Sequence, residues 1–97
     1  MKKLIFLAVL VTLTACANHN RPMADAAHDY KRHDYARAFD SALLAAAHGD
    51  PAAEYAVGYM YYNGLGIGKD QDIARMWIRK SAAKNYSPAI NALRDLT

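Results

Sequence analysis

Few side chains in this sequence could carry out hydrolytic or acid–base chemistry. Ser41 and Ser87 are candidate nucleophiles, and Glu54 is the single glutamate. Catalysis needs a nucleophile next to a base, or paired carboxylates, in a sheltered cleft. Ser87 is expected to cap a helix, and Ser41 has no histidine three or four residues away. We therefore expect no active site.

The histidines are the side chains that could ligate zinc or copper. His28 and His33 each begin a His-Asp-Tyr triplet, five residues apart, while His19 and His48 lie elsewhere. A spacing of five places two side chains on different sides of a continuous helix. With no cysteine other than Cys16 to complete a site, we expect no metal and no cofactor. A metal site at the histidines stays the alternative.

Three glycines, Gly64, Gly66 and Gly68, could suggest a phosphate-binding loop. They follow a predicted helix, however, and the next residues are Lys69-Asp70. A phosphate loop follows a strand and continues with Lys-Ser or Lys-Thr. The glycines are instead expected to let the chain reverse between two helices.

Tyrosines form a stripe on one predicted helix, because Tyr55, Tyr59 and Tyr62 fall at spacings of four and three. In one interpretation the rings pack on neighbouring helices. In the other, one or two rings line a concave groove that receives a protein segment, since tyrosine supplies contact area at low entropic cost. These three tyrosines are our candidate partner-binding residues, while Tyr61 and Trp77 are expected in the core.

The elements that position these residues are predicted to be helices. Apolar residues recur at spacings of three and four, and no stretch alternates with a period of two. Asp34, Asp50 and Asp70 are expected to cap helices, and Ser87-Pro88 repeats the pattern of Asp50-Pro51. The expected helices cover residues 23–30, 35–47, 51–63, 71–84 and 88–96.

An internal repeat becomes visible when the chain is shifted by about 36 residues, which aligns alanines of successive segments. The alanine matches include Ala38 with Ala74 and Ala53 with Ala89. The segment 53–70, followed by Ala74, Trp77 and Ala82-Ala83, resembles a Sel1-like repeat, which is related to the tetratricopeptide repeat. The resemblance implies an all-α fold, a short solenoid of about four to five antiparallel helices. Since three or more repeats usually share a core, we expect terminal helices to act as caps, or a partner or second copy to complete the stack.

The N-terminal residues indicate export. Lys2-Lys3 precede an apolar run over residues 4–13, which has the length of a signal peptide and is too short to span a bilayer. The following Leu13-Thr14-Ala15-Cys16 resembles the lipobox of bacterial lipoproteins. The resemblance implies cleavage after Ala15 and attachment of lipid, such as palmitate, to Cys16. The expected organisation is a signal peptide over 1–15, a flexible tether over 16–22 and a repeat domain over 23–97.

The charge of the predicted mature chain is close to neutral. Removal of Lys2 and Lys3 lowers the basic residues from 12 to 10, against 9 acidic residues. This balance gives no electrostatic reason to expect a nucleic-acid partner. A single cysteine also means that the domain must fold without internal disulfides.

These observations predict a non-enzymatic adaptor that binds another protein in the cell envelope. Ala17, where an aspartate would signal inner-membrane retention in lipoproteins, implies the periplasmic face of the outer membrane of a Gram-negative bacterium. One alternative is an inhibitor or accessory factor of a cell-wall enzyme. The other is an enzyme of the beta-lactamase sort found among cysteine-rich Sel1-like relatives, whose disulfides this sequence lacks. The partner, the oligomeric state and the exposure of each tyrosine stay open.

Overall fold

The computed structural model describes residues 21–96, and in this range the chain forms five helices and no strand. These are α2 (Arg21–Lys31), α3 (Tyr35–Ala47), α4 (Pro51–Asn63), α5 (Gln71–Ala82) and α6 (Ser87–Leu96). The all-helical prediction is confirmed. The predicted signal peptide and Cys16 lie outside the described residues. None of the helices within residues 21–96 combines the length and apolarity needed to cross a bilayer.

Helix boundaries agree with the prediction except at a few ends. α2 begins at Arg21 and so includes the last two residues of the predicted tether. Pro22 is compatible with this start, because the first turn of a helix has no use for its missing N–H. α5 ends at Ala82, and Asn85 in the following turn has a positive φ of 63°.

Aspartate caps begin three of the helices, as the sequence predicts. The Asp34 carboxylate accepts a hydrogen bond from the Arg37 amide. Asp50 accepts from the amides of Ala52 and Ala53 at 2.9 and 3.4 Å. Asp70 does the same for the amides of two residues, Asp72 and Ile73.

The cap predicted at Ser87 is wrong. α6 already includes Ser87, and the preceding Tyr86 carbonyl accepts hydrogen bonds from the amides of Ala89 and Ile90. Tyr86 therefore occupies the N-cap position, because its carbonyl accepts the first helical hydrogen bond. The Ser87-Pro88 pair lies inside the first turn, one position later than Asp50-Pro51 lies in α4.

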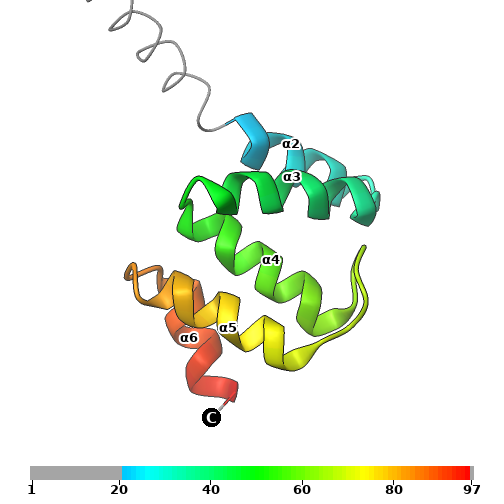
Figure 1. The fold of residues 1–97 in the computed structure, drawn as a ribbon. Coiled ribbons are helices and arrows are strands. Elements are labelled where there is room, and N and C mark those ends of the chain that lie inside the picture. Colours follow the sequence, from blue (N-terminus) through cyan, green and yellow to red (C-terminus); the bar gives the residue numbers. More distant parts are fainter. Residues whose placement is uncertain (1–20, 97) are drawn as a thin grey trace, which may run out of the picture.

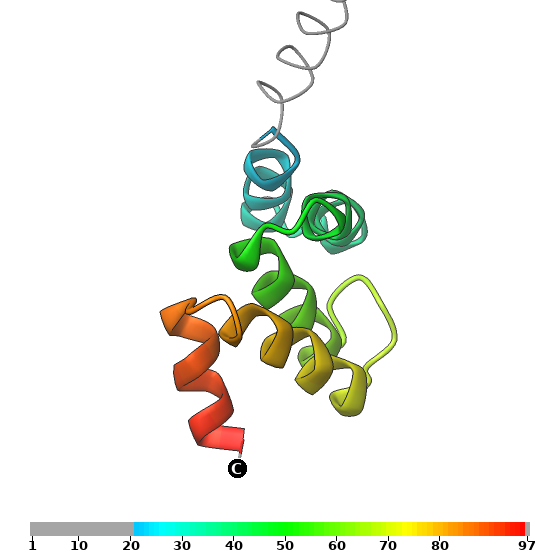
Figure 2. The same ribbon diagram turned by 60° about the vertical axis from the view of Figure 1, so that its left-hand side comes forward.

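The helices stack in chain order, with α2 and α6 at opposite ends of the stack (Figures 1 and 2). Each helix packs against the next one along the chain, and the contact between α4 and α5 is the most extensive. Gly58 permits this approach, because a Cβ there would lie 2.7 Å from Ile78 Cγ1 on α5. The arrangement is that of a helical-hairpin solenoid, as predicted.

The core is built mainly from small side chains. Its largest buried hydrophobic members are Phe39, Val57, Met60 and Ile78, and buried alanines from all five helices fill the remaining space. Tyr61 and Trp77 pack against this cluster while staying partly exposed. The Phe39 and Tyr61 rings meet edge to face, with their centroids 5.4 Å apart.

The glycine loop after α4 folds back onto the start of α3. Gly64 ends α4 in the left-handed conformation, with φ of 69°. Gly66 has φ of 74°, and a Cβ there would overlap the Tyr35 carbonyl oxygen. The Asp70 amide donates to the Tyr61 carbonyl at 2.9 Å. The glycines therefore allow a tight reversal, as predicted, and they also seat the loop on the preceding hairpin.

A polar cluster joins the start of α4 to the end of α5. Glu54 is fully buried, and its carboxylate oxygens lie 3.0 Å from Lys84 Nζ and 3.7 Å from Lys80 Nζ. Lys84 also donates to the Gly49 carbonyl at 2.8 Å, and Ser81 donates to the Pro51 carbonyl at 2.6 Å. The two lysines therefore neutralise a buried carboxylate.

Candidate functional site

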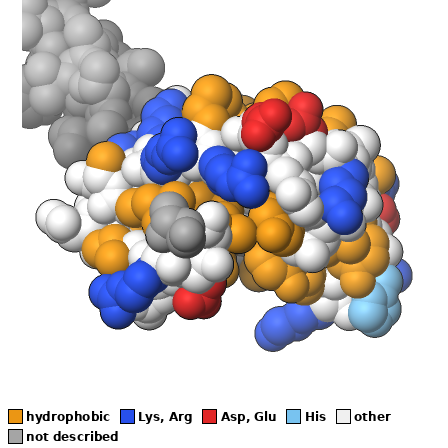
Figure 3. Space-filling view, turned by 90° about the horizontal axis from the view of Figure 1, so that it is seen from below, with side chains coloured by type: hydrophobic (Ala, Val, Ile, Leu, Met, Phe, Trp, Pro, Cys, Tyr) orange, Lys and Arg blue, Asp and Glu red, His pale blue; other side chains and the backbone are white. Residues whose placement is uncertain are grey.

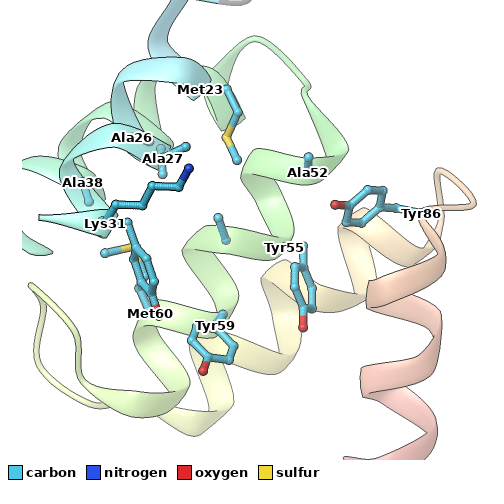
Figure 4. Close-up of a pocket in the computed structure, with 13 residues that line it drawn as sticks. Met23, Ala26, Ala27, Lys31, Ala38, Ala52, Tyr55, Tyr59, Met60 and Tyr86 are labelled. Atoms are coloured by element: carbon cyan, nitrogen blue, oxygen red, sulfur yellow. The ribbon is translucent and has the colours of Figure 1, made fainter. Parts of the chain in front are cut away.

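An apolar groove of about 370 Å³ lies between α2, α3, α4 and the residue that precedes α6. Its floor consists of small side chains from three helices, because each helix turns an alanine stripe toward the same space. Figure 4 shows the lining residues gathered around this opening. The alanines that line it are Ala26, Ala27, Ala38, Ala42, Ala52 and Ala56.

Tyrosines form much of the wall. Tyr55 and Tyr59 lie one turn apart on α4, with ring centroids 6.4 Å apart, and Tyr86 lies 5.9 Å from Tyr55 (Figure 4). Tyr30 approaches from α2. Tyr59 and Tyr30 are 43% and 37% exposed, so their rings can meet a ligand without a change of fold.

Burial raises the pKa of two of these phenols above the ordinary value of 10.0. For Tyr30, burial is the largest cause, and the neighbouring Tyr59 phenol adds to the increase in pKa. For Tyr55, burial is again the largest cause of the raised pKa, followed by Tyr59 and Tyr86. The phenols are therefore neutral hydrogen-bonding groups at physiological pH.

The charge that the groove offers a ligand is basic and not acidic. Lys31 is the single charged residue among the described residues that line it, and the lining includes no aspartate or glutamate. On the face seen from below, hydrophobic side chains lie among Lys, Arg, Asp and Glu side chains (Figure 3). An apolar floor with phenol and ammonium donors at its edge suits an apolar side chain that has an acceptor beside it.

The structure separates the three predicted tyrosines. Tyr55 and Tyr59 line the groove, whereas Tyr62 is half-buried and lies outside the lining. Tyr62 belongs to the last turn of α4, and its side chain leaves the helix about a quarter-turn from the centre of the groove face. Residues spaced by three and four cover a wider strip of α4 than the strip that faces the groove. Spacing alone therefore does not separate Tyr62 from the two tyrosines of the groove.

Sequence reasoning missed Met23, Tyr30, Lys31 and Tyr86 as groove residues. Tyr30 and Lys31 end α2, and Tyr86 lies in the turn before α6, so no helical periodicity relates them to Tyr55. Their convergence depends on the way successive hairpins stack. The sequence offered no local signal for it.

A second, polar pocket of about 250 Å³ brings Ser41 and His28 together. Helical spacing around Ser41 supplies no histidine, and the pairing of α2 with α3 brings His28 to it instead. His28 Nδ1 lies 3.6 Å from Asp29 Oδ1, but the imidazole is 68% exposed. Within residues 21–96 no hydrogen bond joins Ser41 to His28, so the pocket lacks the contact of a nucleophile with its base.

The contacts of His33 are local and do not indicate a metal site. His33 has a positive φ of 61° in the turn after α2, and its Nδ1 lies 2.8 Å from the Tyr35 hydroxyl. Across the described part of the chain, no three His, Cys, Asp or Glu side chains gather in a way that could hold a metal ion.

Comparison with known protein families gives a match over part of the chain. The Sel1 repeat model matches residues 51–86, which span α4, the glycine loop, α5 and the turn that ends at Tyr86. A chitin synthase regulator from Saccharomyces cerevisiae is 39% identical over 62 residues, or 64% of this chain. The match spans only 9% of the length of that yeast protein. No solved structure gave a significant match. Residues 51–86 are thus similar to a Sel1 repeat.

Proposed function

We propose that this protein is a non-enzymatic binding module whose tyrosine-walled groove receives a segment of a partner protein. The observation that carries the proposal is the convergence of Tyr30, Tyr55, Tyr59 and Tyr86 on one alanine-floored groove. Tyrosine is enriched among residues that dominate binding energy at protein interfaces. The Sel1 repeat supports the same class of function, since stacked helical hairpins build extended binding surfaces.

The size of the groove limits what it binds. Ligand pockets typically measure about 300–1,000 Å³, so a groove of about 370 Å³ is at the lower end of that range. It has room for an anchor of one or two large apolar side chains rather than for a whole helix. Most of the partner would then lie across the exposed surface around the groove.

Attachment to a membrane is the second part of the proposal. We place lipid on Cys16 and the domain at the periplasmic face of a bacterial outer membrane, on the basis of the sequence around residues 13–17. Tethering keeps the domain at high local concentration near envelope partners, so modest groove affinity would suffice. Labelling cells with a palmitate analogue tests this part by itself. Label on the wild-type chain and none on Cys16→Ser is the expected result, and an unlabelled wild-type chain would exclude the lipid anchor.

The binding function is tested by crosslinking in cells, followed by purification of the full chain and identification of its partners. The double variant Tyr55→Ala, Tyr59→Ala removes the two tyrosines that α4 contributes to the wall of the groove. Tyr62→Ala is the matched control, because it removes the same side chain from the same helix outside the lining. We expect the double variant to lose a specific partner that wild type and control both retain, with the helical circular dichroism signal intact. Equal partner sets for all three proteins would mean that the groove is not the binding site.

The match to a yeast chitin synthase regulator favours one narrower function. In this alternative the domain regulates an enzyme that makes or remodels a cell-wall polysaccharide. Adding the purified chain to membranes that carry out cell-wall synthesis should then change the rate, and the double tyrosine variant should not. A rate that is unaffected by the wild-type chain would exclude this alternative and leave the general binding function in place.

A further inference from the structure

A ridge of exposed side chains runs along the outer face of α3. Leu43 and Leu44 are 38% and 55% exposed, and the exposed Asp40 lies one turn before them. Ala38 and Ala42, which line the groove, leave the opposite side of the helix, because side chains advance by about 100° per residue. Asp40, Leu43 and Leu44 are called the α3 ridge below.

The internal repeat shows that the fold does not require apolar residues on this ridge. A shift of 36 residues aligns Leu43 with Arg79 and Leu44 with Lys80, which are exposed on α5. The same two positions therefore carry charge in one hairpin, where Lys80 also reaches the buried Glu54, and two adjacent leucines in the other. Adjacent exposed apolar side chains mark interaction sites more often than single exposed apolar side chains do.

The ridge and the groove have complementary chemistry. The groove offers an apolar floor with Lys31 as its charged residue, and the ridge offers two leucines with Asp40 as its charged residue. The ion pairs recorded within residues 21–96 involve other side chains, so Lys31 and Asp40 both have charge to offer a partner. Opposite charges beside matching apolar surfaces favour one register of docking.

We propose that the α3 ridge of one copy docks in the groove of a second copy, with Leu43 and Leu44 over the alanine floor and Asp40 paired with Lys31. Since ridge and groove lie on opposite sides of α3, a molecule cannot fill its own groove. The contact is head to tail, so it generates open chains or rings of copies rather than a two-fold dimer. A docked copy occupies the groove, which excludes a partner protein until the copies separate.

Cysteine crosslinking of the full chain in cells tests this arrangement. The double variant Lys31→Cys, Asp40→Cys places a thiol on each side of the proposed contact, and a short bismaleimide joins thiols that meet. We expect products of two, three and more copies. The wild-type chain and each single variant measure any background through Cys16, and they should not give the series.

Two further substitutions in the double-cysteine variant show whether the ridge makes the contact. Leu44→Lys should reduce the crosslinked products by about tenfold or more, because it puts a charge against the apolar floor. Met76→Lys is the matched control, since Met76 is 57% exposed on the outer face of α5. It should leave the products unchanged, and circular dichroism should show an intact fold for both.

Three outcomes would overturn the proposal. Monomer alone in the double-cysteine variant would show that ridge and groove do not meet. Products that stop at two copies and form in one single-cysteine variant would show a two-fold contact instead. Products unaffected by Leu44→Lys would come from random collision. None of these results touches the proposed function, which is tested by the loss of a partner in the tyrosine variants.

Discussion

The seating of Gly66 on α3 predicts a graded response to alanine in the glycine loop. Gly66→Ala introduces a Cβ that overlaps the Tyr35 carbonyl, in a backbone conformation with φ of 74°. The left-handed conformation costs a non-glycine residue about 1–2 kcal/mol, and forcing an atom into packed structure costs about 1–3 kcal/mol. We therefore expect Gly66→Ala to lower the free energy of unfolding by about 2–5 kcal/mol.

That loss is large for a domain of this size. At about 0.05–0.15 kcal/mol per residue, the described residues support a total free energy of unfolding of about 4–11 kcal/mol. Urea titration followed by far-ultraviolet circular dichroism measures the difference directly. The Gly66→Ala chain should unfold at a clearly lower urea concentration, or be partly unfolded without urea.

The loop supplies its own controls. Gly64→Ala requires the left-handed conformation, but its nearest contact, Lys69 Cβ at 3.2 Å, is a close contact and not an overlap, so the expected loss is about 1–2 kcal/mol. Gly68→Ala meets nothing within 4 Å and should change stability by less than about 0.5 kcal/mol. Gly66→Asn separates the two causes at position 66, because asparagine tolerates the left-handed conformation while still carrying a Cβ.

Equal stability of Gly66→Ala and Gly68→Ala would refute the reasoning, since it would mean that the loop is not seated on α3. Recovery of stability in Gly66→Asn would show that conformation alone sets the cost. If Gly66→Asn stays destabilised, the overlap with Tyr35 accounts for most of the lost free energy of unfolding. The loop then stabilises the packing of the two hairpins through its contact with α3.

Three other predictions follow from single features of the fold. Lys84→Met should lower the free energy of unfolding by about 3 kcal/mol and by more than Lys80→Met in urea titrations, because it leaves the buried Glu54 with only the more distant lysine; equal losses would contradict the stronger role of Lys84. Asp50→Ala should cost about 1 kcal/mol and Ser87→Ala much less in the same assay, since only Asp50 caps its helix; a larger loss at Ser87 would mean that Ser87 is the N-cap of α6 after all. Unfolding should become easier as pH rises above about 10, because the raised pKa values of Tyr30 and Tyr55 mean that the folded chain holds protons that the unfolded chain releases; stability measured from pH 9 to 11 and a spectrophotometric tyrosine titration check this, and phenols that all titrate as free tyrosine would contradict it.

The helices could be predicted from sequence because their signals are local. Asp34, Asp50 and Asp70 each precede a helix by one residue, and the acceptor that makes them caps is their own side chain. Pairings between helices gave no such signal. Lys80 and Lys84 have the spacing of a solvated face, and only the approach of α5 to α4 reveals the buried Glu54 between them. A lone glutamate in an alanine-rich helix could have indicated a buried ion pair. Sequence alone does not identify its partners, because they are about thirty residues away.

The candidate site shows the same division between local and tertiary information. The spacing of Tyr55 and Tyr59 identified one wall of the groove from α4 alone. The other two tyrosines of the wall, Tyr30 and Tyr86, sit at a helix end and in a turn, where side-chain direction does not follow a helical period. A surface built between hairpins depends on the angle at which the hairpins stack. Small residues allow the helices to pack closely, but they do not fix that angle. The function of such a repeat is therefore better read from the positions where successive hairpins differ, such as Leu44 against Lys80, than from the residues that they share.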